Sequence, residues 1–133
     1  MRARAVSTLR RFVACRRPRW PLWLADTDSH ADLGRVVNVL VATKEFKDAG
    51  DDVKLIFDGA GTKWPGVLAD PGHKSHRLYE QVADVIAGAC GYCARAFDAE
   101  DDVHAAKVPL LEDYHDHPSL RSLAASGYQI VTF

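Results

Sequence analysis

Two cysteines three residues apart, Cys90 and Cys93, are the side chains of this sequence best suited to chemistry. They follow the apolar run 85–87 and precede the helix-like stretch 94–97, which predicts a junction between a strand and a helix. Residues i and i+3 share a face in the first turn of a helix, so the two sulfur atoms can reach disulfide distance. The free backbone N–H groups of that turn favour negative charge and lower the pKa of a thiol. We expect Cys90 to be the attacking nucleophile and Cys93 the resolving thiol.

The elements that must position this pair alternate between strands and helices. Short apolar runs predict strands, and apolar residues at helical spacing predict helices, the first of them ending at Gly50. The expected strands are 22–25, 53–57, 85–89, 108–111 and 128–133, and helices are expected over 30–49 and from about 75, 91 and 118. This order is typical of an α/β fold: a single three-layer domain with a doubly wound, mostly parallel sheet of about five strands.

Ligand sites in such sheets lie beyond the carboxyl ends of the strands. The polar segments 26–28, 58–61 and 90–93 follow the first three expected strands, so one rim of the sheet gathers them. An imidazole near this rim could accept a proton from a thiol, although it could also be an ordinary surface histidine. The expected supporting residues are His30, Asp58 and Tyr92, the last packed over the cysteines.

The segment from Asp58 to Lys74 holds four glycines and two prolines. Its length favours a functional lid or binding loop, in which Trp64 either covers the site or anchors the loop. Its glycines either let backbone N–H groups converge on an anion or serve a tight turn, and they do not match a dinucleotide or Walker pattern. The expected anion-binding residues are Gly59, Ala60, Gly61, Thr62 and Lys63.

A zinc site would need two ligands besides the cysteines. His104, or His115 and His117, could supply them, but the sequence does not place these histidines near the pair. We therefore expect no metal and no other cofactor.

Size and charge limit the classes of protein to which this chain can belong. A chain of 133 residues with 47% hydrophobic residues fits one domain, and no stretch reaches the roughly 18 apolar residues of a membrane span. Residues 1–20 hold seven arginines and no acid, so the other residues, ten basic and eighteen acidic, carry a formal net charge of −8. That acidic body argues against nucleic-acid binding. Three cysteines make no disulfide framework, which favours a cytoplasmic location.

The basic segment 1–20 precedes the expected domain, 21–133, and allows three interpretations. A secretory or twin-arginine signal would need an apolar region of about 7–15 residues, but Arg16 and Arg17 interrupt the apolar run 12–15. An organellar transit peptide suits the arginine-rich, acid-free composition. A disordered extension fits the lack of an apolar period and is the expected state, with no role for Cys15.

Residues 22–133 resemble the DsrE/DsrF-like family, small α/β proteins of flavodoxin-like or Rossmann-like architecture that include sulfur carriers. The resemblance is carried by the stretches 30–35 (HADLGR), 49–53 (AGDDV), 57–64 (FDGAGTKW), 88–93 (GACGYC) and 127–133 (GYQIVTF). It implies that Cys90 takes up sulfur as a persulfide and that the protein is a homo-oligomer, a trimer or hexamer. The second thiol, Cys93, departs from the sulfur carriers, because it would attack a persulfide on Cys90 and release hydrosulfide.

The sequence thus predicts a protein that handles sulfane sulfur, either as a persulfide carrier or as a sulfurtransferase-like relay. Thiol–disulfide exchange, and a non-catalytic module that binds a small anion or nucleotide with structural cysteines, stay open as alternatives, so enzymatic activity is undecided. The expected partners are sulfur donor and acceptor proteins or low-molecular-weight thiols, with no nucleic acid and no membrane.

Overall fold

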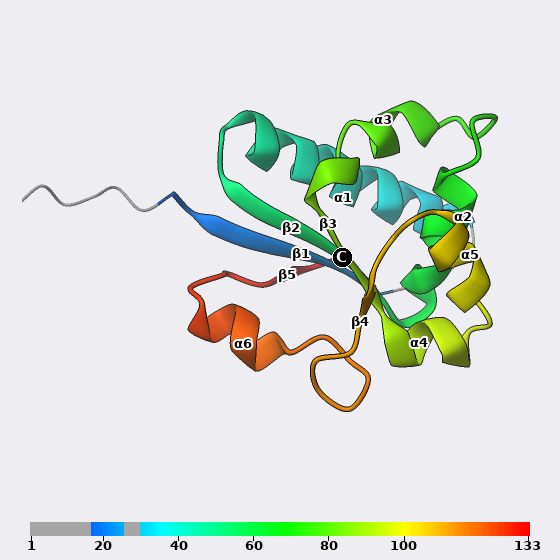
Figure 1. The fold of residues 1–133 in the computed structure, drawn as a ribbon. Coiled ribbons are helices and arrows are strands. Elements are labelled where there is room, and N and C mark those ends of the chain that lie inside the picture. The colour runs from blue at the N-terminus through cyan, green and yellow to red at the C-terminus, as the bar shows by residue number, and fades with distance from the viewer. Residues whose placement is uncertain (1–16, 26–29) are drawn as a thin grey trace, which may run out of the picture.

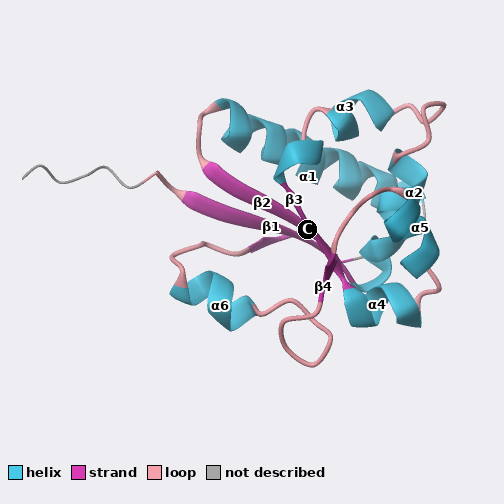
Figure 2. Ribbon diagram, viewed as in Figure 1, coloured by secondary structure: helices cyan, strands magenta, loops and turns pink. Residues whose placement is uncertain are grey.

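The fold is a five-stranded parallel sheet between helices, in a computed structural model that describes residues 17–25 and 30–133 (Figure 2). The strands run in the order β4-β3-β2-β1-β5, and each neighbouring pair is parallel. They are β1 (Arg19–Ala25), β2 (Asp52–Asp58), β3 (Ile86–Cys90), β4 (Leu110–Leu111) and β5 (Val131–Thr132). The expected three-layer α/β fold is confirmed.

The helices divide between the two faces of the sheet (Figure 1). They are α1 (His30–Asp48), α2 (Trp64–Leu68), α3 (His76–Glu80), α4 (Gly91–Ala96), α5 (Glu100–Ala105) and α6 (Leu120–Ala125), with 3-10 turns η1 (Gly59–Lys63) and η2 (Ala83–Val85). The chain steps from β1 to β4 one neighbour at a time, with α1 and α3 on one face, and then returns across the other face through α6. The connections after β3 and β4 therefore diverge, which makes this pair the topological switch point of the sheet.

Helix α1 is positioned by one buried stripe and a glycine stop. Val36, Leu40 and Thr43 are fully buried, whereas the apolar side chain of Val41 is 51% exposed. Gly50 has φ +80°, and the N–H of the next residue, Asp51, donates to the Phe46 carbonyl at 3.0 Å. This bonding pattern ends a helix with a left-handed glycine, so the expected end at Gly50 is confirmed.

Strand β2 forms the centre of the core. Leu55, Ile56 and Phe57 are consecutive buried residues, as expected for a strand covered on both faces. Its neighbour β1 contains Pro21, which cannot donate a backbone hydrogen bond. Strand β5 pairs with β1 only at Leu22 and Trp23, so Pro21 lies where β1 has one partner strand.

The segment after β2 is packed rather than open. The 3-10 turn η1 leads directly into α2, where Trp64 is 5% exposed and Leu68 is fully buried. The expected lid over 58–74 is therefore wrong for residues 59–68, which Trp64 anchors in the core. In the acidic run 98–102 the three aspartates are exposed and Ala99 is buried. The run leads into α5, where carboxylates favour the amino end of a helix.

Some expectations concern residues near the amino terminus, which the structure describes only in part. Strand β1 begins at Arg19, whose guanidinium Nε lies 3.1 Å from the Asp52 carboxylate, so the sheet starts slightly before the expected boundary at residue 21. Residues 1–16 of the extension that is expected to be disordered, including Cys15, and the polar segment 26–28 lie outside the described residues, as does the side chain of His30. In residues 17–25 and 30–133, no helix combines the length and apolar character needed to cross a membrane.

Gly88 allows β3 to approach the chain before β4. A methyl group on Gly88 would lie 2.6 Å from the Pro109 carbonyl oxygen and 2.6 Å from Leu111 Cγ. We expect Gly88→Ala to lower the free energy of unfolding in urea by about 2–3 kcal/mol, because the backbone must move. Gly34→Ala is the control, since nothing lies within 4 Å of its added methyl group. In helix α1 it should raise stability by about 0.5–1 kcal/mol. Equal stability of Gly88→Ala and wild type would contradict this packing.

Candidate thiol site

Three strands deliver the candidate site at their carboxyl ends. Asp58 is the last residue of β2, Cys90 is the last residue of β3, and His117 lies in the connection after β4. Cys93 follows in the first turn of α4. The polar segments expected to converge on one rim therefore do so for β2 and β3, next to the topological switch point of the sheet.

Cys90 is buried between the end of the sheet and the His117 loop. Its Sγ accepts a hydrogen bond from the Cys93 backbone N–H at 3.4 Å, so the residue is the N-cap of α4. The same sulfur lies 3.1 Å from Nδ1 of His117. Because Cys90 is 0% exposed, the imidazole is a polar neighbour of a sulfur that water does not reach. A neutral imidazole with its proton on Nε2 accepts the thiol proton at Nδ1.

Cys93 is the more accessible of the two thiols. It is half-buried, and its Sγ donates to Oδ1 of Asp58 at 3.2 Å. The thiol sulfurs of both cysteines, a carboxylate oxygen of Asp58 and a ring nitrogen of His117 all lie within 4.8 Å of one another. Two thiols, a carboxylate and an imidazole therefore meet around one point.

A tight turn over residues 114–117 places the imidazole. His115 and Asp116 have φ +48° and +62°, and Tyr114 and His117 exchange two backbone hydrogen bonds of 2.9 Å. Two successive central residues with positive φ characterise a type I′ turn, which is strained for side chains other than glycine, asparagine and aspartate. The Tyr92 N–H donates to the Asp116 carbonyl at 2.8 Å and fastens this turn to α4.

The rings of Tyr92 and His117 pack against each other. Their centroids are 4.7 Å apart and their planes are tilted by 30°. Tyr92 is 54% exposed, so its ring forms part of the outer surface of the site. The expectation that Tyr92 covers the cysteines is thus refined, because its direct ring partner is His117.

The expectation that the pKa of the Cys90 thiol is lowered is wrong. Burial raises the pKa of Cys90 to about 12, although the Cys93 backbone N–H favours the thiolate. The pKa of Cys93 is raised as well, first by burial and also by its hydrogen bond to Asp58, against the lowering effect of the Gly59 N–H. Helix α4 has six residues and supplies a weak field, which desolvation of the sulfur outweighs.

The expected anion-binding residues form a closed turn. Gly61 and Thr62 are buried, and the Thr62 hydroxyl donates to the Gly59 carbonyl at 2.8 Å. Lys63 Nζ lies 5.9 Å from the centre of the Phe97 ring. Gly61 and Thr62 thus do not line an open nest, because their turn packs into the protein, and Gly59 contributes to the site through its N–H beside Cys93.

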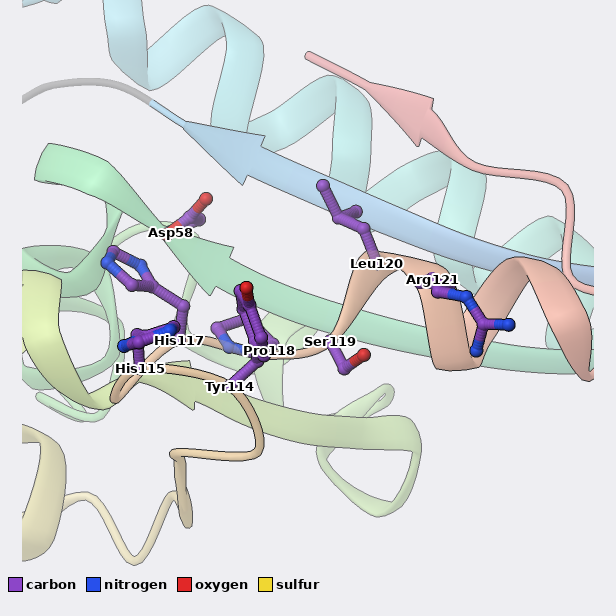
Figure 3. A pocket seen from close by; sticks show the side chains of 8 residues that line it. All are labelled: Asp58, Tyr114, His115, His117, Pro118, Ser119, Leu120 and Arg121. Carbon is purple, nitrogen blue, oxygen red and sulfur yellow. The ribbon is translucent and has the colours of Figure 1, made fainter.

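A cavity of about 610 Å³ opens beside the site (Figure 3). Asp58 and His117 belong to both the cavity wall and the thiol cluster, so the cavity leads from solvent to the cluster. Other lining side chains come from the turn and from the start of α6: Tyr114, His115, Pro118, Ser119, Leu120 and Arg121.

Of the site residues, His117 is the one least predictable from the sequence. It is one of three histidines considered as ligands, and the structure brings it to the cysteines while the described cluster includes neither His104 nor His115. The signal was the position of His117 after the fourth strand, at the rim that also carries Asp58 and Cys90. The four clustered side chains, Asp58, Cys90, Cys93 and His117, could hold a metal ion.

Comparisons with known proteins give one relative and no assignment of activity. The chain is 29% identical over 96 residues to "Uncharacterized protein MJ0733" of Methanocaldococcus jannaschii, an alignment that covers 72% of this chain and 78% of that protein. No family model matches the chain. No solved structure matches it either.

The two thiols should differ in their reactivity toward iodoacetamide. In reduced, chelator-treated protein at pH 7, Cys93 should be alkylated much faster than Cys90, since Cys90 is buried and its thiolate fraction is about one in 10⁵. Labelling of Cys90 should still rise about tenfold per pH unit above pH 9, because its pKa is raised to about 12. Fragmentation of the peptide that carries both cysteines measures each rate. A plateau in Cys90 labelling below pH 8 would contradict the burial argument.

Proposed function

We propose that this protein handles sulfane sulfur through the Cys90–Cys93 pair, taking it from a persulfide and releasing it as hydrosulfide. The observation that supports the proposal is the contact of 3.1 Å between Cys90 Sγ and His117 Nδ1, next to a second thiol. A thiol with an imidazole in hydrogen-bond range is the arrangement of an activated sulfur nucleophile. The neighbouring thiol lets the pair cycle between dithiol and disulfide.

Access favours Cys93 as the thiol that meets the donor. Cys93 is half-buried beside Asp58, which lines the cavity, whereas Cys90 is 0% exposed. An external persulfide can therefore approach Cys93 without displacing the His117 loop. This assignment reverses the roles expected from the sequence, in which Cys90 attacks and Cys93 resolves.

The proposed reaction has two transfers. The Cys93 thiolate attacks the outer sulfur of a persulfide R–S–SH; the S–S bond of the donor breaks, R–S⁻ takes up the thiol proton, and Cys93 carries the persulfide. The Cys90 thiol then gives its proton to His117 and attacks Sγ of Cys93, which forms the Cys90–Cys93 disulfide and expels HS⁻. The sulfane sulfur is reduced by two electrons and the dithiol is oxidised by two. A low-molecular-weight thiol or a protein dithiol regenerates the reduced pair.

Further features of the proposal come from the resemblance to the DsrE/DsrF-like family. They are donor and acceptor proteins as partners and assembly into a trimer or hexamer. A cytoplasmic location is proposed separately, because the cysteines make no disulfide framework and free thiols stay reduced there. Thiol–disulfide exchange with an ordinary disulfide would use the same two transfers. A module that binds a small anion without thiol chemistry is the alternative from a different class.

Mass spectrometry after incubation with a persulfide donor tests the proposal. Wild-type protein should lose two hydrogens and release one hydrosulfide per chain. Cys90→Ser should instead retain a one-sulfur adduct on Cys93, because no thiol remains to resolve it. Cys93→Ser should stay unmodified, because the remaining site thiol is buried. Cys15→Ser is the matched control and should behave like wild type.

Two results would contradict the proposal, and each points to a different explanation. A persistent adduct on Cys93→Ser would restore Cys90 as the attacking thiol. A wild-type protein that stays unmodified with excess donor would refute thiol chemistry and favour the anion-binding alternative.

His117 should speed the second transfer. We expect His117→Asn to slow hydrosulfide release by about 10²-fold and to let the Cys93 persulfide accumulate, because the imidazole accepts the Cys90 proton. His104→Asn is the matched control, since His104 is exposed on α5 and lies outside the thiol cluster. Single-turnover measurements of hydrosulfide give both rates. Equal rates for the two variants would remove the imidazole from the mechanism.

A further inference from the structure

We infer that Asp58, Cys90, Cys93 and His117 form a binding site for Zn²⁺ in the reduced protein. This inference goes beyond the proposed sulfur chemistry and does not rest on it. It also departs from the expectation drawn from the sequence, which assigned no metal because it could not bring His117 to the cysteines.

The donor set matches the preferences of zinc. Zn²⁺ binds thiolate sulfur, imidazole nitrogen and carboxylate oxygen, commonly as a tetrahedron of four such atoms. Thiolates select zinc over the hard ions Mg²⁺ and Ca²⁺, which prefer oxygen ligands alone. The four side chains supply two sulfurs, one nitrogen and one carboxylate oxygen, so the coordination shell is complete without an external ligand.

The distances match the size of such a site. Zn–S bonds of about 2.3 Å and Zn–N or Zn–O bonds of about 2.0 Å place neighbouring ligand atoms about 3.3–3.8 Å apart in a tetrahedron. Here Cys90 Sγ lies 3.1 Å from His117 Nδ1, and Cys93 Sγ lies 3.2 Å from Asp58 Oδ1. All four ligand atoms lie within 4.8 Å of one another. Shifts of up to about 1 Å in the ligand atoms would therefore complete the tetrahedron, and side-chain torsions supply shifts of that size.

The backbone holds these ligands in place. Asp58 and Cys90 end adjacent strands, and Cys93 lies one helical turn after Cys90. The strained type I′ turn before His117 is fastened to α4 by the hydrogen bond from Tyr92 N–H to the Asp116 carbonyl. Backbone strain beside a functional side chain persists because the surrounding structure enforces it. The ligands therefore need little ordering when the ion binds, which is what a preorganised site requires.

The site also has polar support and an entry path. The Cys93 N–H donates to Cys90 Sγ at 3.4 Å, and the Gly59 N–H lowers the pKa of Cys93, so a backbone N–H favours each thiolate. Such outer contacts orient metal ligands and stabilise their charge. The cavity of about 610 Å³ reaches Asp58 and His117, so an ion can enter from that side.

Zinc binding and disulfide formation exclude each other. The Cys90–Cys93 disulfide has no thiolate to offer, and bound zinc occupies the electron pairs with which the thiolates attack. Oxidation of the pair should therefore release the ion. Zinc in turn should protect both thiols from alkylation and from a persulfide donor.

Metal titration of the full chain tests the site. Reduced, metal-free protein at micromolar concentration should take one Zn²⁺ per chain in competition with a chromophoric chelator. Co²⁺ in its place should show the visible bands of a tetrahedral ion and the near-ultraviolet charge-transfer band of cobalt–thiolate bonds. Cys90→Ser, Cys93→Ser and His117→Asn should each weaken zinc binding by about 100-fold or more, and Asp58→Asn by at least about 10-fold. His104→Asn and Cys15→Ser should bind like wild type.

The outcomes separate this inference from the proposed function. Circular dichroism of each metal-free variant shows whether the variant is folded. Where a variant is unfolded, the titration of wild-type protein still tests whether the chain binds zinc. No stoichiometric binding by folded wild type, or binding that all four substitutions leave intact, would overturn the site. Zinc binding by a protein whose metal-free, reduced form does not react with a persulfide donor would leave the site standing and refute the sulfur chemistry.

Discussion

Desolvation of the Cys90 sulfur is the constraint on which the roles of the surrounding groups depend. The sulfur sits at the end of a central parallel strand with no exposure to solvent, so a thiolate there is unfavourable unless a partner compensates its charge. Candidate partners surround it: the Cys93 N–H, the His117 imidazole and the second thiol. Sulfur transfer uses the imidazole as a proton acceptor, whereas a bound cation would compensate both thiolates directly. Both roles arise from the same electrostatic constraint.

The topology of the sheet explains why these particular residues meet. Parallel strands bring all their carboxyl ends to one edge, so Asp58, Cys90 and the loop after Leu111 converge although they lie far apart in the sequence. At β3 and β4 the following connections leave toward opposite faces of the sheet. The His117 turn fills the resulting gap. A small parallel domain thereby builds a four-residue cluster from local turns, without a dedicated insertion.

Much of this arrangement was predictable from the sequence, and the failures have physical causes. The periodic residues of α1, the apolar run of β2 and the glycine stop at Gly50 are local signals, and each predicted its element correctly. The packing of 59–68 was missed because glycine and proline suggest an open loop, while Trp64 and Leu68 bury themselves through tertiary contacts. The pKa of Cys90 was misjudged because a helix terminus is visible in the sequence and the depth of a sulfur is not. His117 reaches the site through a turn with two left-handed residues, His115 and Asp116, which carry no glycine signal.

Apart from its hydrogen bond to α4, the His117 turn lies in a part of the chain with few buried side chains. It follows the two-residue strand β4 and precedes α6, which buries none of its six side chains. Segments with few buried contacts separate from the native structure at a lower free energy than the sheet does. Detachment of residues 112–125 would uncover Cys90 while the sheet stays intact. Exposure of the Cys90 sulfur would thus require this edge to loosen, and would not require the sheet to unfold.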